Sequence, residues 1–177
     1  MESTYPRTPK KLPKYITKTK VDEILNKVRE TSTKDYLILL TLFRTGMRSS
    51  ELVHLKKRDI SQGEITIRQG KGNKDRIIPI DEGLYDLLML HSNTLNLEDR
   101  LFPVTTARIR QICSKYKSDE NLHPHSLRHS YAIFCLKSGM NIRALQKILG
   151  HSTLSTTAVY LDLIGQDLKD EHKKILW

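Results

Sequence analysis

Residues 35–52 read DYLILLTLFRTGMRSSEL, and this stretch decides the fold class. From Asp35 to Phe43 nearly every position is apolar, which predicts a helix surrounded by protein on all sides at the centre of the core. Gly46 is expected to end this helix. Ser49-Ser50-Glu51 then predicts a short second helix, so that Arg48 lies at a junction where backbone holds it on both sides.

Further helices are predicted around this centre from apolar residues that recur every three to four positions. In one of them, the helical repeat places Leu127, Tyr131 and Phe134 on an apolar face, with Arg128 and His129 on the other face. The full set covers about 21–28 after a capping-box-like start at Thr19, about 82–91, about 105–117, a segment from Ser126, residues 142–149 between Asn141 and Gly150, and two segments at about 154–161 and 165–175.

Two β-branched runs predict a β-hairpin. Ile65 and Ile67 alternate with polar residues, and a second run of isoleucines lies at 77–80. The residues between them, 70–75, read GKGNKD and would form a basic tip. The expected fold class is therefore mainly α with a small antiparallel β-hairpin or sheet (α+β).

The charge of the chain favours a polyanionic partner. It has 30 Lys and Arg residues against 20 Asp and Glu, a net charge of +10 and a pI near 9.6. Residues 1–20 hold six basic residues and one acid. Because three prolines prevent a helix in residues 1–16, this segment is predicted to be an extended linker or tail that either follows a phosphate backbone or is simply solvated.

The length and cysteine content suit one domain in a reducing compartment. The 177 residues can enclose a hydrophobic core, and Cys113 and Cys135 are far too few for a disulfide scaffold. No apolar run approaches the ~20 residues that span a bilayer, and the first residues do not resemble a secretion signal. The expected location is the cytoplasm, in association with the nucleoid, without a membrane partner.

Common catalytic motifs do not occur in the sequence. A Walker loop, a GxSxG elbow, a CxxC pair and an HExxH helix are all missing, which argues against nucleotide hydrolysis and leaves a set of cations and tyrosines. His125 and His129, four residues apart, would be able to bind zinc with His123 or His151 as a third ligand. This metal site stays open as an alternative to a site without metal or cofactor.

A protein without metal can still break a phosphodiester. Negative charge builds on the non-bridging oxygens of the phosphorus, and planar arginine forks meet those oxygens with paired, charge-assisted hydrogen bonds. A tyrosine nucleophile of pKa ~10 is only about 0.1% ionised at neutral pH, a handicap of roughly 4 kcal/mol that cations or a base must offset. The departing oxygen needs a proton, which a lysine or histidine can give.

Four segments together resemble the catalytic boxes of the tyrosine recombinases, the phage integrase family. Their order and spacing agree with the family over roughly residues 17–165. The segments are Thr45-Gly46-Met47-Arg48-Ser49-Ser50-Glu51-Leu52, Gly70-Lys71-Gly72-Asn73-Lys74-Asp75-Arg76, His125-Ser126-Leu127-Arg128-His129-Ser130, and Leu149-Gly150-His151 with Tyr160 nine residues later.

The resemblance implies a role for each of six residues. Tyr160 would attack the scissile phosphate, forming a 3′-phosphotyrosyl link and releasing a 5′-hydroxyl, while Arg48 and Arg128 hold the phosphate oxygens. Lys71 would protonate the leaving oxygen from the hairpin tip. His125 would act as acid and base toward the tyrosine, and His151 would donate a hydrogen bond to the phosphate. His129 is expected to pack or hydrogen-bond locally.

The expected partner is double-stranded DNA. Members of this family usually carry an N-terminal core-binding domain, which this sequence lacks, so residues 1–16 are interpreted as a linker or tail and residues 17–177 as the catalytic domain. Weak, steeply salt-dependent binding is expected. The basic residues expected to contact DNA are Lys10, Lys11, Lys14, Lys18, Lys20, Lys74 and Arg76.

Two further alternatives concern activity and assembly. The chain would be either a site-specific recombinase or a non-cleaving DNA-binding regulator or remnant of the same fold; type IB topoisomerases use similar chemistry, but the hairpin and the Leu149-Gly150-His151 box resemble recombinases more. On DNA the resemblance implies a tetramer, whereas the isolated domain is expected to be a monomer. Residues 161–177 would pack on their own domain or on a neighbouring protomer, the former being favoured in isolation.

Overall fold

The computed structural model describes residues 14–68, 75–117, 121–153 and 157–161. A three-stranded antiparallel sheet lies beside a set of helices, so the predicted class is confirmed. The helices are α1 (Lys18–Thr31), α2 (Thr33–Thr45), α3 (Ser49–Leu52), α4 (Glu82–His91), α5 (Thr106–Lys115), α6 (Pro124–Lys137) and α7 (Ile142–Leu149). A 3₁₀ turn at Lys57–Asp59 precedes the strands β1 (Ile60–Ser61), β2 (Glu64–Ile67) and β3 (Arg76–Pro79), and residues 157–161 are also helical.

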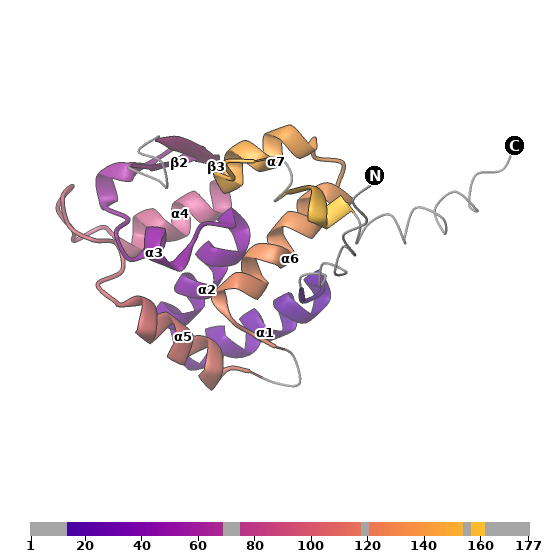
Figure 1. Ribbon diagram of the computed structural model, residues 1–177. Helices are drawn as coiled ribbons and strands as arrows, with labels where there is room; N and C mark the ends of the chain where they lie inside the picture. The colour runs from indigo at the N-terminus through magenta and orange to yellow at the C-terminus, as the bar shows by residue number, and fades with distance from the viewer. Residues whose placement is uncertain (1–13, 69–74, 118–120, 154–156, 162–177) are drawn as a thin grey trace, which may run out of the picture.

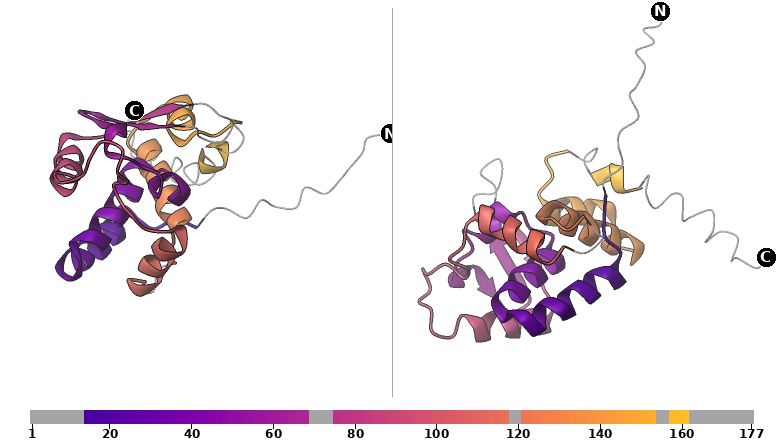
Figure 2. Two further views of the ribbon diagram at one scale, coloured as in Figure 1. Left: turned by 90° about the vertical axis from the view of Figure 1, so that its left-hand side faces the viewer. Right: turned by 90° about the horizontal axis from the view of Figure 1, so that it is seen from below.

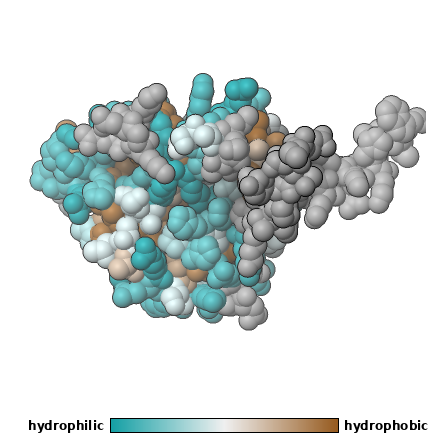
Figure 3. Space-filling view, in the orientation of Figure 1, coloured by the Kyte–Doolittle hydropathy of each residue, from teal (hydrophilic) through white to brown (hydrophobic). Residues whose placement is uncertain are grey.

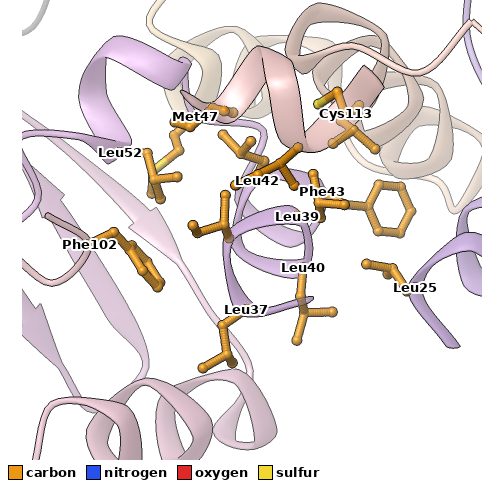
Figure 4. Packing of buried hydrophobic residues seen from close by; sticks show 14 of the residues in the cluster. Leu25, Leu37, Leu39, Leu40, Leu42, Phe43, Met47, Leu52, Phe102 and Cys113 are labelled. Carbon is orange, nitrogen blue, oxygen red and sulfur yellow. The ribbon is translucent and has the colours of Figure 1, made fainter. Parts of the chain in front are cut away.

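Helix α2 is the centre of the core, as its unbroken apolar run predicts. It packs against α1, α4, α5 and α6, and its leucines point in several directions around the helix axis toward those neighbours (Figure 4). Leu39 and Leu42 are almost completely buried, and so is the polar Thr41. Its hydroxyl compensates for the loss of water by donating to the Leu37 carbonyl at 2.7 Å. A helix this apolar is stable only inside other elements.

Several of the other elements lie on opposite sides of α2 and α6. Figure 1 shows α1 and α5 below these two helices and the sheet and α7 above them, and the left view in Figure 2 keeps the same separation. Helix α7 packs on β3, and α6 packs on both α2 and α7. The ends of α2, α6 and α7 therefore lie close to the first residues of β3.

The predicted hairpin is confirmed and extended by one strand. β2 pairs with β3 in antiparallel register, with Ile65 opposite Ile78. Ile65, Ile67 and Ile78 face the core, while Ile77 on the other face is 53% exposed. The added strand β1 has only two residues, too short for an alternating pattern to reveal it in the sequence.

Most helix boundaries follow the sequence signals. The side chains of Ser32 and Asn141 accept the N-terminal hydrogen bonds of α2 and α7, and Gly150 ends α7 in the left-handed conformation. The start of α1 differs from the prediction, because Thr17 is its cap and Thr19 lies inside the helix. The apolar face predicted for α6 is wrong at Phe134, which is 39% exposed.

The face seen in Figure 3 is mostly hydrophilic, with hydrophobic residues in scattered patches. Within the described parts of the chain, no helix combines the length and the hydrophobicity that a bilayer crossing demands.

Gly46 provides a test of the packing at the end of α2. Its φ is 61°, and an added Cβ would lie 2.4 Å from Cδ1 of Tyr131 on α6. We expect Gly46→Ala to lower the free energy of unfolding by about 3–5 kcal/mol, because backbone strain and overpacking add. Urea unfolding followed by circular dichroism measures this.

The matched control is Gly63→Ala. Gly63 also has a positive φ, 84°, but no atom lies within 4 Å of an added Cβ. Only strain applies there, so the expected loss is about 1–2 kcal/mol. Equal losses for the two variants would show that the contact of Gly46 with α6 contributes nothing.

Candidate active site

The buried guanidinium of Arg128 joins the ends of two helices. This α6 side chain donates from Nη1 to the Gly46 carbonyl and from Nη2 to the Leu149 carbonyl, each at 2.6 Å. The two carbonyls lie at the C-terminal ends of α2 and α7, where peptide dipoles leave partial negative charge. The residue is 5% exposed, so these helix ends compensate a charge that is almost out of water.

Arg48 reaches the neighbouring carbonyl. It caps the N-terminus of α3, and its Nη2 donates to the carbonyl of Gly150 at 3.4 Å. Its Nη1 donates to Glu51 Oε1 at 3.0 Å, and a quarter of the side chain is exposed. Two arginines 80 positions apart in the chain therefore bind consecutive peptide carbonyls.

The two guanidiniums repel each other. Burial, followed by the positive charge of Arg48, lowers the pKa of Arg128 to about 10. Arg128 nevertheless stays protonated at neutral pH. An anion placed against both arginines would relieve this repulsion, which makes the position suitable for a phosphate group.

His151 lies beside the arginine pair. It directly follows Gly150, and its Nδ1 is 2.9 Å from Oγ1 of the buried Thr157. Burial lowers the pKa of His151 to about 4, with further contributions from Arg128 and Arg48. The ring is therefore neutral at pH 7 and can offer one N–H to a phosphate oxygen without adding to the local charge.

The hydroxyl of Tyr160 contacts a histidine. Nδ1 of His129 lies 2.8 Å from Tyr160 Oη, and the two rings are tilted at 56° with centroids 5.7 Å apart. Burial lowers the pKa of His129 to about 4, assisted by His125 and His123. A neutral ring accepts the phenol hydrogen, so the expectation that His129 bonds locally is wrong: its partner is 31 residues away.

Tyr160 is held in a neutral, inaccessible form. It is 3% exposed, and burial raises the pKa of its phenol despite the opposing effect of Arg128. A hydrogen bond donated by the phenol also favours the protonated form. The structure thus shows the tyrosine close enough to Arg128 to feel its charge, but not exposed for attack on a phosphate.

The two remaining predicted catalytic residues are not among the described groups that contact one another in this site. His125 lies in the first turn of α6 with its side chain exposed, and its charge affects His123 and His129. Lys71 lies outside the described residues. The site therefore brings together Arg48, Arg128, His151 and Tyr160, with His125 at its margin.

The residues predicted to contact DNA have varied surroundings. Lys14 is exposed, whereas Lys18 pairs with Asp22 at 2.6 Å and Lys20 with Glu23 at 2.8 Å. Arg76 is directed into the protein, where it binds Glu51 and the carbonyl of Ile148. Three of the predicted lysines, Lys10, Lys11 and Lys74, lie outside the described residues.

Sequence reasoning missed two residues of the site, Glu51 and His129. Glu51 was used only as a signal for the start of α3, yet its carboxylate binds Arg48. The available signal was an acid three residues after an arginine at a helix cap, which indicates a carboxylate that can orient the guanidinium. For His129, only the tertiary position of Tyr160 reveals the contact.

The zinc alternative has no support in the described geometry. Among residues 14–68, 75–117, 121–153 and 157–161, no three His, Cys, Asp or Glu side chains are grouped so that they could hold a metal ion. His123, one of the proposed ligands, uses Nδ1 to accept the backbone N–H of Ser126. The histidines instead serve the helix cap, Tyr160 and Thr157.

The sequence is similar to those of known proteins. The sequence model described as the phage integrase family matches residues 14–166. The tyrosine recombinase XerA of Thermococcus kodakarensis is 37% identical over 183 residues, covering 96% of this chain and 65% of the relative. XerA of Pyrococcus furiosus is 38% identical, covering 93% and 63%. The chain thus spans just under two thirds of the length of these relatives.

Solved structures show the same fold. A crystal structure of XerA recombinase superimposes with a TM-score of 0.77 at 26% identity, covering 98% of this chain and 68% of that one. The catalytic domain of bacteriophage HP1 integrase gives 0.70 at 26%, covering 90% and 94%. XerH site-specific recombinase bound to its difH substrate, a pre-cleavage complex, gives 0.70 at 25%, covering 88% and 52%.

The neutral histidines predict a pH dependence of stability. His129 and His151 have pKa values of about 4 in the folded protein, against ~6.5 in the unfolded chain. Between these values the unfolded state binds more protons, so the free energy of unfolding should be highest above pH 6.5 and fall as the pH falls toward 4. Urea unfolding at a series of pH values measures this.

Replacing both histidines by glutamine should flatten that part of the profile. His54→Gln, which changes an exposed ring that does not contribute to the pKa shifts of His129 and His151, is the control and should keep the wild-type slope. A double variant as steep as the wild type would show that these two rings are not the groups that take up protons on unfolding.

Proposed function

Because the chain belongs to the phage integrase family, we propose that it is the catalytic part of a site-specific DNA recombinase. It cleaves and rejoins DNA strands through a covalent bond between Tyr160 and a 3′-phosphate. The observation that carries this proposal is the arginine pair, in which Arg48 and Arg128 bind consecutive carbonyls beside His151. These groups come from three separate segments of the chain, and the fold gains no stability from placing two like charges side by side.

The arginine pair stabilises the transition state of strand cleavage. The Tyr160 oxygen forms a bond to phosphorus as the bond from phosphorus to the 5′-oxygen breaks, and charge accumulates on the two non-bridging oxygens. Arg48 and Arg128 donate to those oxygens, with a further hydrogen bond from His151. Preorganised donors of this kind are worth about 3–4 kcal/mol each in other enzymes.

Two protons must move for the reaction to balance. The phenol loses one, and the departing 5′-oxygen gains one. We assign His125 to the first transfer and Lys71 to the second, as the resemblance implies. His129 is too weak a base to keep the phenol proton, since burial lowers the pKa of His129 to about 4 and raises the pKa of the phenol.

His129 therefore holds Tyr160 before reaction. The nucleophile is buried and neutral while this hydrogen bond exists, so the phenol must leave His129 before it attacks. The covalent intermediate conserves the phosphodiester energy, because one ester bond replaces another. A 5′-hydroxyl of a second strand can then reverse the reaction on a new partner and complete recombination.

The proposed partner is double-stranded DNA. The basic charge of the chain supports this, as does XerH, a structural neighbour solved on its own DNA substrate. We also propose that four protomers assemble on DNA, that the isolated chain is a monomer, and that it acts in the cytoplasm at the nucleoid. The alternative of a non-cleaving DNA-binding regulator has less support, because all six expected catalytic residues are present in the sequence.

Strand cleavage can be tested with a nicked suicide duplex that carries a recombination half-site. Loss of a short oligonucleotide after cleavage prevents rejoining, so wild-type protein should accumulate as a covalent protein–DNA band on a denaturing gel. Tyr160→Phe should give no such band, because no oxygen remains to attack. EDTA should leave the band intact.

Each contrary result has a defined meaning. A band that survives Tyr160→Phe would show that another residue is the nucleophile, and sensitivity to EDTA would revive the zinc site. Wild-type protein that binds the duplex without forming any covalent band would favour the regulator.

DNA binding should depend steeply on salt. The logarithm of the affinity falls by about 0.9 per phosphate contact for each tenfold rise in salt. Lys14→Gln, which removes an exposed cation of the segment before α1, should reduce that slope by about one contact. Fluorescence anisotropy with labelled duplex at several salt concentrations measures both quantities.

Lys34→Gln is the matched control. Lys34 is exposed in the first turn of α2, about 18 Å along the helix from the Gly46 carbonyl that binds Arg128. Lys34→Gln removes the same charge as Lys14→Gln, but far from the proposed site, and should leave the salt dependence of the affinity unchanged. A tight complex insensitive to salt would contradict the proposed mode of binding.

A further inference from the structure

Glu51 accepts four hydrogen bonds from two arginines. Its Oε1 receives Nη1 of Arg48 at 3.0 Å and Nη1 of Arg76 at 2.9 Å. Its Oε2 receives the backbone N–H of Arg48 at 2.6 Å and Nη2 of Arg76 at 2.7 Å. The two oxygens of a carboxylate offer about four acceptor positions, so the group is fully used.

Arg76 makes the more extensive set of contacts of the two arginines. Its two terminal nitrogens meet both oxygens of Glu51 in a fork-to-fork pair, and its Nε donates to the Ile148 carbonyl at 2.8 Å. Only 11% of the side chain is exposed. One guanidinium therefore connects β3, α3 and the end of α7.

The same side chain packs against Gly150. A Cβ at Gly150 would lie 3.0 Å from Cδ and Nε of Arg76 and 3.1 Å from Cζ. Gly150 supplies the carbonyl that accepts Arg48, and the preceding Leu149 supplies one that accepts Arg128. Arg76 thus lies against the backbone that anchors both members of the arginine pair.

The electrostatics favour this arrangement. Burial tends to raise the pKa of Glu51, but hydrogen bonds and charge from Arg76 and Arg48 outweigh it and lower the pKa overall. Glu51 stays ionised and attracts Arg48. A free arginine side chain samples many rotamers, so a fixed carboxylate gives Arg48 one orientation before a phosphate arrives.

We propose that Arg76 is a positioning residue for strand cleavage, and that it acts through Glu51 to orient Arg48 instead of contacting DNA. Its fork holds the carboxylate in the one rotamer that satisfies the backbone and the side chain of Arg48 together. Its contact with Ile148 and Gly150 keeps the carbonyl acceptors of the arginine pair in register with α3. The inference rests on the proposed function, because it concerns the rate of that cleavage.

The test separates the cleavage rate from DNA affinity. Single-turnover cleavage of the suicide duplex at saturating DNA should be about 10- to 100-fold slower for Arg76→Gln, because misplaced Arg48 weakens transition-state binding. Affinity and its salt slope, measured with Tyr160→Phe as background, should not change. Arg76→Lys should be nearly as slow as Arg76→Gln, since an ammonium cannot reproduce the fork.

A double-mutant cycle tests the path through Glu51. Glu51→Gln should slow cleavage by a similar factor, and the variant with both substitutions should be little slower than the worse single variant, because the two residues act as one unit. Arg68→Gln is the matched control: it breaks an ion pair with another buried carboxylate, Asp59, at 2.7 Å. Because half of the Arg68 side chain is exposed, this variant should lose less stability than Arg76→Gln and should keep the wild-type cleavage rate.

A measurement without cleavage keeps the inference testable if the proposed function fails. NMR of the arginine side chains reports how fast the Arg48 guanidinium rotates in the folded protein. This rotation should be slow in the wild type and clearly faster in Arg76→Lys and Glu51→Gln, whether or not DNA is cleaved. Absence of a covalent band in the wild type would reject the recombinase proposal alone.

Three results would overturn the role of Arg76. One is a loss of affinity and salt slope with an unchanged rate at saturation, which would make it a DNA contact. Another is a double variant whose fold-loss in cleavage rate equals the product of the losses caused by Glu51→Gln and Arg76→Gln alone. The third is unchanged rotation of Arg48 in Arg76→Lys.

Discussion

The guanidinium of Arg128 donates to the carbonyls that end α2 and α7, and the rest of the site depends on this bridge. A buried cation is costly unless charge and hydrogen bonds surround it. Here the negative ends of two helix dipoles accept its hydrogen bonds, and the charge of Glu51, which binds Arg48, adds to them. The outcome is a positive group fixed in the core and still able to attract an anion.

Arg48 and Glu51 extend this arrangement toward solvent. Arg48 and Arg128 repel each other because both are positively charged, so Arg48 stays beside Arg128 only if other groups anchor it. The carbonyl of Gly150 and the carboxylate of Glu51 provide it, and Arg76 holds that carboxylate in turn. The strand β3 thereby contributes to a site whose other parts are helical.

Tyr160, the proposed nucleophile, lies out of contact with solvent near this charged centre. Tyr160 is buried with His129, and burial raises its pKa. In the proposed reaction, the phenol must leave this state before it attacks a phosphate. The helical segment 157–161 also carries Thr157, the partner of His151, so movement of Tyr160 would affect a second member of the site.

By itself, the sequence determined the helical class, the central helix, the hairpin and the catalytic boxes, because these follow from local periodicity, from glycines that end helices and from motif order. The partners of His129 and Arg76 were decided only by the tertiary structure. His129 had no local feature to indicate Tyr160, and Arg76 was grouped with DNA contacts by its charge and its place after the hairpin tip. A side chain's charge is a local property, but whether that charge meets a phosphate or an internal carboxylate depends on which distant segments fold against it.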